Sequence, residues 1–577
     1  MKFFHAYSDF FNPGLEKNGF INKDTGFKLP HCFAVPLERQ FNQFAVKDGP
    51  LYNFIKDGNF PFYVDRVAGG IIYYPYAFDK KTIHDYKELL GDWFLGFQMH
   101  ESASNRRRAE WPRLMRWAGG SKGPFDVQLL KDKSRCTYRF APDGSALYGL
   151  SHDTPDYYAT RKYAETYQEF IEEIRDMCQR RLDVTDGNVL PADSSYLMCK
   201  LHADMGMRNF MPEIGGACRM TRLAVATARG QARSGKGRMW GTYYEPWREL
   251  RDGRACQPSY TTDFRNEWHL TQETHRDNFT SFGPNGGSSR LLQKRQLFYC
   301  LMSGAHYMAE EWGVRDSFTD FNDFTLSPYG EVKKEFLNKA LNFQGMQAHT
   351  PIAIVLPNEY TCVQLPSDFD DYEYKVHRDT YMLAPLTDAQ KDYIGHIEDV
   401  IKLAFIQNEP YGNEGLFMTN SRFGDLFDVI YEDADDETLS RYAYLIDASP
   451  DGSFAKAKAN TSFKVLESKD LDALEVKLHS LEKEVMPCVV DGLHWLVSTD
   501  ENGVRYLTIF NNEGNERSID TGDTIYRQAD KLVNVWFKDK TEPTVVEQFG
   551  IGMYIQKRDE HNYAINVPAT GFVILKF

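Results

Sequence analysis

Short apolar runs alternate with helical stretches over about the first 340 residues of the chain. The apolar runs predict eight strands, at Lys2–Ser8, Pro30–Leu37, Phe60–Arg66, Phe94–Glu101, Tyr196–His202, Asn209–Ile214, Met239–Glu245 and His306–Glu311. Helical patterns lie between several of them or close the series, at Lys80–Leu90, Gln168–Arg181, Arg219–Arg233, Leu291–Ser303 and Gly330–Phe343. This alternation is typical of a parallel sheet, so residues 1–345 are predicted to form an α/β catalytic domain, a (β/α)8 TIM barrel.

The pattern changes after Gln344, and two further domains are predicted. Residues 346–485 contain strand patterns at Pro351–Pro357, Phe427–Tyr431 and Ala443–Ala448, with helical patterns at Ile394–Gln407 and Leu471–Val485. Such alternation favours a small flavodoxin-like α/β domain. Residues 486–577 instead contain short strands separated by Asn, Gly and Asp turns, which predicts a C-terminal antiparallel, β-sandwich-like domain.

The charge of the chain narrows the expected partners. Its 67 Lys and Arg residues oppose 82 Asp and Glu residues, for a formal net charge of −15 at pH 7. Nucleic acid is not an expected partner, because phosphate binding needs a basic face. No run approaches the ~18 consecutive apolar residues of a transmembrane helix, so a membrane is not expected either. Met1 to Asp9 turns polar too early for a signal peptide, which predicts a cytoplasmic protein, or a periplasmic or secreted one whose leader was removed.

Cysteine and aromatic usage add two expectations. The nine cysteines are scattered without a CxxC pair, so we expect free thiols, with neither a disulfide framework nor a structural zinc site. No other metal and no cofactor is expected either. Aromatic residues make up 14% of the chain. Most of them can be core residues, but aromatic rings also line sugar sites, where the C–H face of a pyranose packs on the ring.

Carboxylates stand at the predicted carboxyl ends of the barrel strands, where the active sites of such barrels lie. Glycoside hydrolysis needs two carboxyl groups, one protonated and one ionised, on either side of the bond to be cleaved. Glu101 and Glu245, at the ends of the fourth and seventh strands, would face each other across the barrel mouth. We expect Glu101 as general acid/base and Glu245 as nucleophile, since tyrosine donors beside Glu245 favour its charged form. The expected substrate-binding residues are Glu213, Glu310, Glu311, His100, Tyr244, Trp247, Trp312 and Asn105.

Other interpretations of these residues stay open. Glu101 could pair with Arg106–Arg108 and Glu245 with Arg248, and an error in strand register would move the nucleophile to Glu310 or Glu311. His202 and Asp204 could ligate a metal, although no third ligand stands at a telling spacing. The chain could also be a non-catalytic carbohydrate-binding protein. A further alternative is a lyase acting on uronates, with His100 or His202 as base.

Lys87–Glu101 (KELLGDWFLGFQMHE) resembles the segment that leads to the acid/base Glu in the large clan of retaining barrel glycosidases. The layout is most similar to the family forty-two β-galactosidases and their distant relatives, and Leu291–His306 and Asp433–Ala448 are further similarities. The resemblance implies an exo-acting retaining hydrolase of terminal β-galactosides or β-mannosides that forms a homo-oligomer, a trimer or dimer. Those families usually have Asn before the acid/base Glu. His100 at that position indicates a distant relative with another sugar preference.

Overall fold

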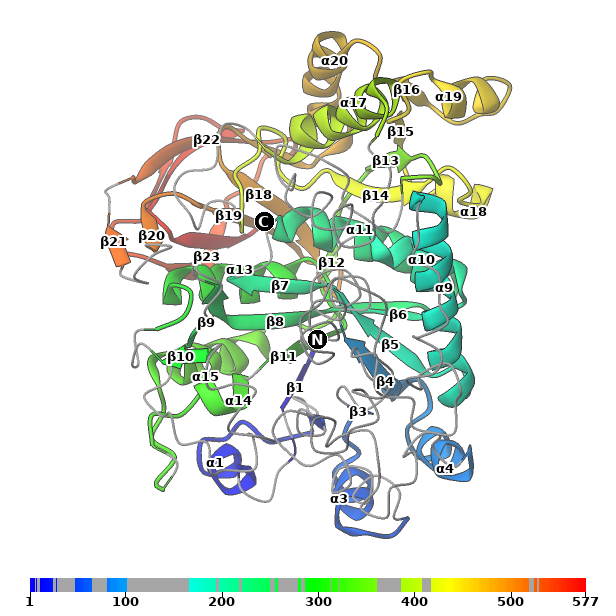
Figure 1. The fold of residues 1–577 in the computed structure, drawn as a ribbon. Helices are drawn as coiled ribbons and strands as arrows, with labels where there is room; N and C mark the ends of the chain where they lie inside the picture. The colour runs from blue at the N-terminus through cyan, green and yellow to red at the C-terminus, as the bar shows by residue number, and fades with distance from the viewer. Residues whose placement is uncertain are drawn as a thin grey trace.

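The computed structural model of the chain describes residues 1–5, 7, 11–23, 27–28, 47–64, 80–100, 166–193, 197–216, 220–249, 255–257, 279–281, 286–311, 313–320, 322–360, 386–406, 417–517, 524–526 and 529–577. The fold is of mixed α/β type, with parallel and antiparallel sheets (Figure 1). The predicted strand Pro30–Leu37 and three predicted site residues, Glu101, Asn105 and Trp312, lie outside the described residues.

The first parallel sheet has the strand order of the sequence. It consists of β2 (Phe27–Lys28), β3 (Phe62–Val64), β4 (Phe94–His100) and β5 (Val189–Ala192). The helices of this part are α1 (Asn12–Lys17), α3 (Pro50–Gly58), α4 (Lys80–Leu90), the 3-10 turn η1 (Gly91–Trp93) and α9 (Tyr167–Val184). Thr166 begins α9 as a capping box with Glu169, a local signal that starts a helix in the sequence itself.

The second parallel sheet has β8 (Met239–Glu249) at its centre. β8 runs parallel to β6 (Asn209–Phe210), β7 (Glu213–Gly216) and β11 (Tyr307–Glu310), and β11 runs parallel to β1 (Lys2–Phe4). β9 (Ala255–Gln257) runs antiparallel to β8, and β10 (Phe279–Ser281) runs parallel to β9, so these two short strands extend the sheet beyond β8. Its helices are α10 (Met198–Asp204), α11 (Thr221–Arg233), α13 (Arg290–Met302), α14 (Gly313–Asp316) and α15 (Pro328–Ala340).

Alternate residues of these parallel strands enter two different cores, as the two-residue repeat of a strand requires. One core takes side chains from strands of both sheets, and we call it the inner core. It contains Phe4, Tyr63, Leu95, Leu190, Ala192, Met211, Tyr243, Tyr307 and Ala309. The neighbouring residues Phe3, Ile214, Tyr244 and Met308 belong to a larger core shared with α11, α13 and α15, which we call the outer core.

Most predicted elements are present, and α4, β14 (Phe427–Tyr431) and α20 (Leu471–Val485) match the predicted bounds. The predicted fifth strand, Tyr196–His202, is wrong. Helix α10 occupies Met198–Asp204, and the strand lies earlier, at Val189–Ala192. Met198 to Ala203 are all buried, and a short, mostly apolar run of this kind does not distinguish a buried helix from a strand.

The second α/β part has a four-stranded parallel sheet. β13 (Ile352–Leu356) lies between β14 and β15 (Tyr444–Asp447), and β16 (Val465–Glu467) follows β15 at the edge. Its helices are α17 (Asp388–Phe405), α18 (Asp436–Leu439), α19 (Ser453–Lys458) and α20, and in Figure 1 α17, α19 and α20 lie at the top of the molecule. Side chains cap α17 and α20 at Thr387 and Asp470.

The C-terminal part is antiparallel. One sheet has the order β12 (Gln347–Ala348), β18 (His494–Thr499), β19 (Arg505–Phe510), β26 (Phe572–Lys576) and β23 (Thr544–Phe549). The other has the order β17 (Cys488–Val490), β22 (Lys531–Phe537), β25 (Asn562–Val567) and β24 (Tyr554–Lys557). β20 (Asn515–Arg517) and β21 (Thr524–Tyr526) form a hairpin.

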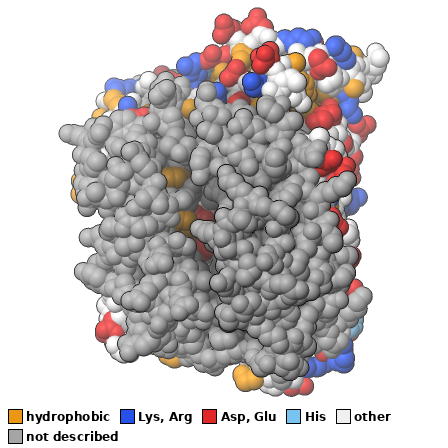
Figure 2. All heavy atoms as spheres, viewed as in Figure 1, with side chains coloured by type: hydrophobic (Ala, Val, Ile, Leu, Met, Phe, Trp, Pro, Cys, Tyr) orange, Lys and Arg blue, Asp and Glu red, His pale blue; other side chains and the backbone are white. Residues whose placement is uncertain are grey.

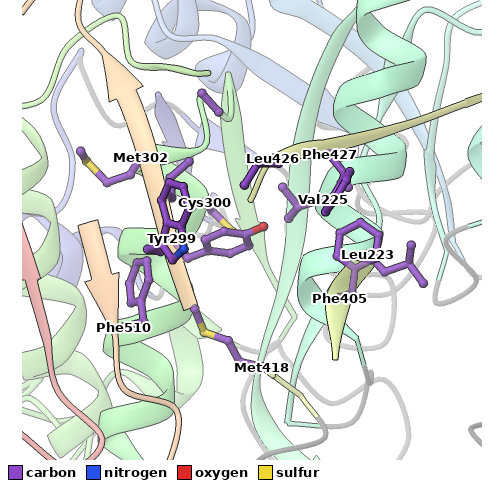
Figure 3. Packing of buried hydrophobic residues seen from close by; sticks show 14 of the residues in the cluster. Leu223, Val225, Tyr299, Cys300, Met302, Phe405, Met418, Leu426, Phe427 and Phe510 are labelled. Carbon is purple, nitrogen blue, oxygen red and sulfur yellow. The ribbon is translucent and has the colours of Figure 1, made fainter. Parts of the chain in front are cut away.

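The outer core continues from the parallel strands into both later parts. Figure 3 shows Leu223 of α11 and Tyr299 of α13 near Phe405, Phe427 and Phe510, which come from α17, β14 and β19. Apolar burial of this kind stabilises by about 25 cal/mol per Å², so the three parts support one another. Among the described helices, none combines the length and apolarity needed to cross a membrane. Cys178, Cys199, Cys300 and Cys488 are buried.

Candidate active site

Three buried glutamates lie on three neighbouring parallel strands. Glu213 begins β7, Glu245 lies in β8, and Glu311 directly follows β11. The strand register places Gly215 beside Glu245 and Glu310 beside Tyr244. The Glu311 N–H donates to the Tyr244 carbonyl at 2.8 Å, so Glu311 comes level with Glu245 on the adjacent strand.

The side chains of these glutamates share one side of the sheet. Each stands two residues after a member of the inner core: Glu213 after Met211, Glu245 after Tyr243, and Glu311 after Ala309. Strand alternation therefore places all three carboxylates on the inner-core side, beyond its apolar residues. They are 2%, 2% and 5% exposed, respectively. We call Glu213, Glu245 and Glu311 the acidic face.

Trp247 joins the acidic face from β8. Its indole Nε1 donates to Glu311 Oε2 at 3.2 Å, and the ring is partly exposed. An indole beside carboxylates offers an apolar surface and hydrogen-bond acceptors in one place, which is the combination that a pyranose needs. In Figure 2, acidic and apolar atoms are visible together near the middle of the face turned to the viewer.

Gly215 brings β7 close to β8 at this point. Its φ is +146°, and a Cβ at this position would lie 2.3 Å from the Glu245 carbonyl oxygen. Any other residue would force the two strands apart beside Glu245. Gly215 and Gly216 are visible in the sequence as a Gly-Gly pair soon after Glu213.

The side chains of Glu310 and Tyr244 lie on the opposite side of the sheet, toward helix α15. Glu310 Oε2 lies 3.1 Å from Lys333 Nζ, and the Tyr329 hydroxyl donates to Glu310 Oε1. The rings of Tyr244 and Tyr329 stack with centroids 6.4 Å apart, and burial raises the pKa of Tyr244 well above its usual value. Of the two adjacent glutamates at the end of the eighth strand, Glu311 shares the acidic face and Glu310 does not.

The remaining predicted residues are distributed as follows. His100 ends β4, with its backbone in register with Ala192 of β5. Glu101, Asn105, Trp312 and Arg106–Arg108 lie outside the described residues. The acidic face is therefore described from three strands, β7, β8 and β11.

His202 and Asp204 do not form a site together. His202 is buried in α10, and burial lowers its pKa to about 3, so its imidazole is neutral at pH 7. Asp204 pairs with Lys200, whose Nζ also lies 2.9 Å from Asp433. In the part of the chain that the structure describes, no group of three His, Cys, Asp or Glu side chains is arranged to hold a metal ion.

No protein-family model and no curated protein sequence matches the chain. Among solved structures, the chain is similar to an α-L-fucosidase isoenzyme 2 from Paenibacillus thiaminolyticus, with 10% identity, coverage of 99% of this chain and 96% of that chain, and a TM-score of 0.43. It is also similar to a β-galactosidase from the Antarctic haloarchaeon Halorubrum lacusprofundi, with 11% identity, coverage of 94% and 98%, and a TM-score of 0.32. Both structures are named as glycosidases. Both TM-scores are low, so neither similarity assigns a function to this chain.

Proposed function

We propose that this protein is a glycoside hydrolase whose active site is the acidic face. The observation that carries the proposal is the gathering of Glu213, Glu245 and Glu311, all buried, on one side of three parallel strands with Trp247 bound to one of them. Carboxyl groups are the side chains that act as general acid, base and nucleophile when a glycosidic bond is cleaved. Acid-catalysed cleavage of a glycosidic bond uses this chemistry.

We further propose that the parallel strands of the two sheets form one eight-stranded barrel, in which β6 and β7 count as one strand and β9 and β10 take no part. Strands of both sheets share the inner core, and the first strand, β1, pairs with the last, β11. The Met211 N–H donates to the Pro191 carbonyl at 3.1 Å, which links β5 to the segment between β6 and β7. On this proposal, residues 1–345 form the catalytic barrel, 346–485 a flavodoxin-like domain and 486–577 a β-sandwich-like domain.

In the proposed barrel, the strand ends of β4 and β8 face each other, so Glu101 would stand across the site from Glu245. Glu101 protonates the glycosidic oxygen while the Glu245 carboxylate attacks the anomeric carbon, which releases the aglycone and leaves a glycosyl ester on Glu245. Glu101 then takes a proton from water, the water oxygen attacks the same carbon, and Glu245 leaves as carboxylate. The sugar is released with its original anomeric configuration.

The other residues of the site would bind the sugar. Glu213 and Glu311 accept hydrogen bonds from sugar hydroxyls, and Trp247 holds Glu311 and offers its ring to the pyranose. His100, Asn105 and Trp312 complete the proposed site. Glu310, paired with Lys333, holds the end of β11 against α15. The proposed substrate is a terminal β-hexoside, a β-galactoside or β-mannoside, and the proposed assembly is a dimer or trimer.

The test is chromophore release from a panel of α- and β-linked aryl glycosides by the full chain. Glu101→Ala and Glu245→Ala are measured in parallel with Glu88→Ala, a control on the exposed side of α4. We expect cleavage of a β-glycoside, loss of turnover in the first two variants only, and azide rescue that gives opposite anomers in the two.

Three outcomes would contradict the proposal in different ways. Full activity of Glu245→Ala with loss of activity in Glu311→Ala would move the nucleophile to β11. Sugar binding without turnover would make the chain a carbohydrate-binding protein. Products that absorb in the ultraviolet from uronate polymers would make it a lyase.

A further inference from the structure

A cavity of about 530 Å³ opens at the amino ends of the parallel strands. Its lining comes from the turn before β8, at Lys236 and Arg238, from the turn before β11, at Gly304 and His306, and from Trp93 directly before β4. Glu245 lies seven strand residues into β8, about 20 Å further along the strand at the usual rise. The cavity is therefore separate from the acidic face.

The lining of this cavity is cationic. Six Lys and Arg side chains contribute to it, namely Lys2, Arg229, Arg233, Lys236, Arg238 and Arg441. None of the described residues that line it is Asp or Glu. In a chain of net charge −15, this concentration of positive charge runs against the overall composition.

The carboxylates behind the lining only partly neutralise it. Asp428 is shared by two arginines, with 2.6 Å to Arg229 Nε and 2.6 Å to Arg233 Nη1. Glu437 is likewise shared, at 3.7 Å from Lys236 Nζ and 3.5 Å from Arg441 Nη2. Each of these two carboxylates therefore serves two cations.

Arg238 adds positive charge on the wall of the cavity. Its two Nη atoms donate to the carbonyls of Gln231 at 3.2 Å and Ala203 at 3.4 Å. Asp204 and Asp433 are the acidic residues that act on it electrostatically, and both are bonded to Lys200. Within the described part of the chain, no carboxylate lies within ion-pair distance of Arg238.

We propose that this cavity binds a small anion that carries a phosphoryl group. Guanidinium groups match phosphate oxygens with two parallel hydrogen bonds, and lysine adds a point charge. The volume is that of a small-molecule site, which is too small for a macromolecular groove. The surplus of cations over carboxylates favours a dianion over a monocarboxylate. The site is independent of the proposed glycosidase activity.

The test is a titration of the full chain with inorganic phosphate and, separately, with glucose 6-phosphate. Binding is measured by calorimetry and by tryptophan fluorescence, because Trp93 and Trp240 line the cavity. Lys236→Gln and Arg441→Gln are the test variants, since these side chains are 89% and 49% exposed and their replacement leaves the core intact. Lys391→Gln, on α17 and 57% exposed, is the control.

We expect saturable binding of one anion per chain, weakened about tenfold by each test variant and unchanged in the control. Tighter binding of the ester than of inorganic phosphate would identify an organic phosphate as the ligand, and equal binding would identify the free ion. The proposal is overturned if neither anion saturates a site. It is also overturned if the test variants bind as well as the control, since the anion would then lie elsewhere.

Discussion

Two regions along the parallel strands carry opposite charge. The acidic face comprises Glu213 of β7, Glu245 of β8 and Glu311 directly after β11, whereas the cavity at the amino ends of β8 and β11 is lined by Lys and Arg. Both regions lie on β8 and β11, so the difference in charge comes from the side chains that each region carries. At the amino ends the cations are partly held by Asp428 and Glu437, which are structural partners. Each end of a parallel strand therefore has its own environment, so that residues for stability and residues for chemistry lie at different positions along the same strand.

The largest expected effect is at the acidic face. Glu245→Gln keeps the volume of the side chain but removes its charge, so we expect kcat on the cleaved β-glycoside to fall at least about 10³-fold. The free energy of unfolding should change by less than about 1 kcal/mol, because Gln keeps the shape and the hydrogen-bonding capacity of the side chain. Activity assays and urea unfolding check the two parts. An active but unstable variant would make the acidic face structural.

A buried carboxylate near the amino ends of the strands should affect stability more than activity. Asp428→Ala leaves the buried Arg229 without its carboxylate, so we expect a loss of about 3–5 kcal/mol in the free energy of unfolding. Asp436→Ala is the matched control, because Asp436 is 76% exposed in its pair with Lys458. Chemical denaturation of both variants measures the difference. Equal stability of the two would show that the buried pairs do not hold α11 on β14.

A smaller effect is expected from pH at His202, whose neighbour Ala203 accepts a hydrogen bond from Arg238. Its folded pKa, about 3, lies below the ordinary 6.5, so the unfolded state takes up a proton first as the pH falls. Stability is lost at up to about 1.4 kcal/mol per pH unit from pH 6.5 downward. Between pH 6.5 and 4.5, the free energy of unfolding of His202→Leu should therefore fall by about 2 kcal/mol less than that of the parent protein. Parallel loss in both proteins would contradict this, and His84→Leu, at an exposed position of α4, is the control.

The smallest expected effect is at the rim of the cationic cavity. Lys236→Gln should change the free energy of unfolding by less than about 0.5 kcal/mol, because its pair with Glu437 is exposed. Glycoside turnover should also be unchanged, since the cavity lies at the other end of the strands. Thermal unfolding and steady-state kinetics measure both quantities. A fall in turnover would show that the two ends of the strands are coupled.

Local sequence determined much of the fold. The helical patterns of apolar and polar positions predicted α4 and α20 to the residue, because such a pattern depends on neighbours within one or two turns of a helix. The predicted strand at Tyr196–His202 was wrong, since α10 is buried on all sides and its apolar run has no telling period. Glu213, Glu245 and Glu311 were visible from the sequence as carboxylates at strand ends.

Tertiary structure decided which of these side chains meet. The choice between the adjacent Glu310 and Glu311 depended on strand alternation relative to the inner core, and Lys333, 23 residues away, pairs with Glu310. The partners of the α11 arginines could not be predicted from the sequence either, because Arg222 and Arg229 pair with Asp425 and Asp428, some 200 residues later in the chain. A pattern of apolar and polar positions sets where a helix or strand forms, since that depends on near neighbours. Which charges are buried together depends on contacts between distant segments, and only the folded chain creates those contacts.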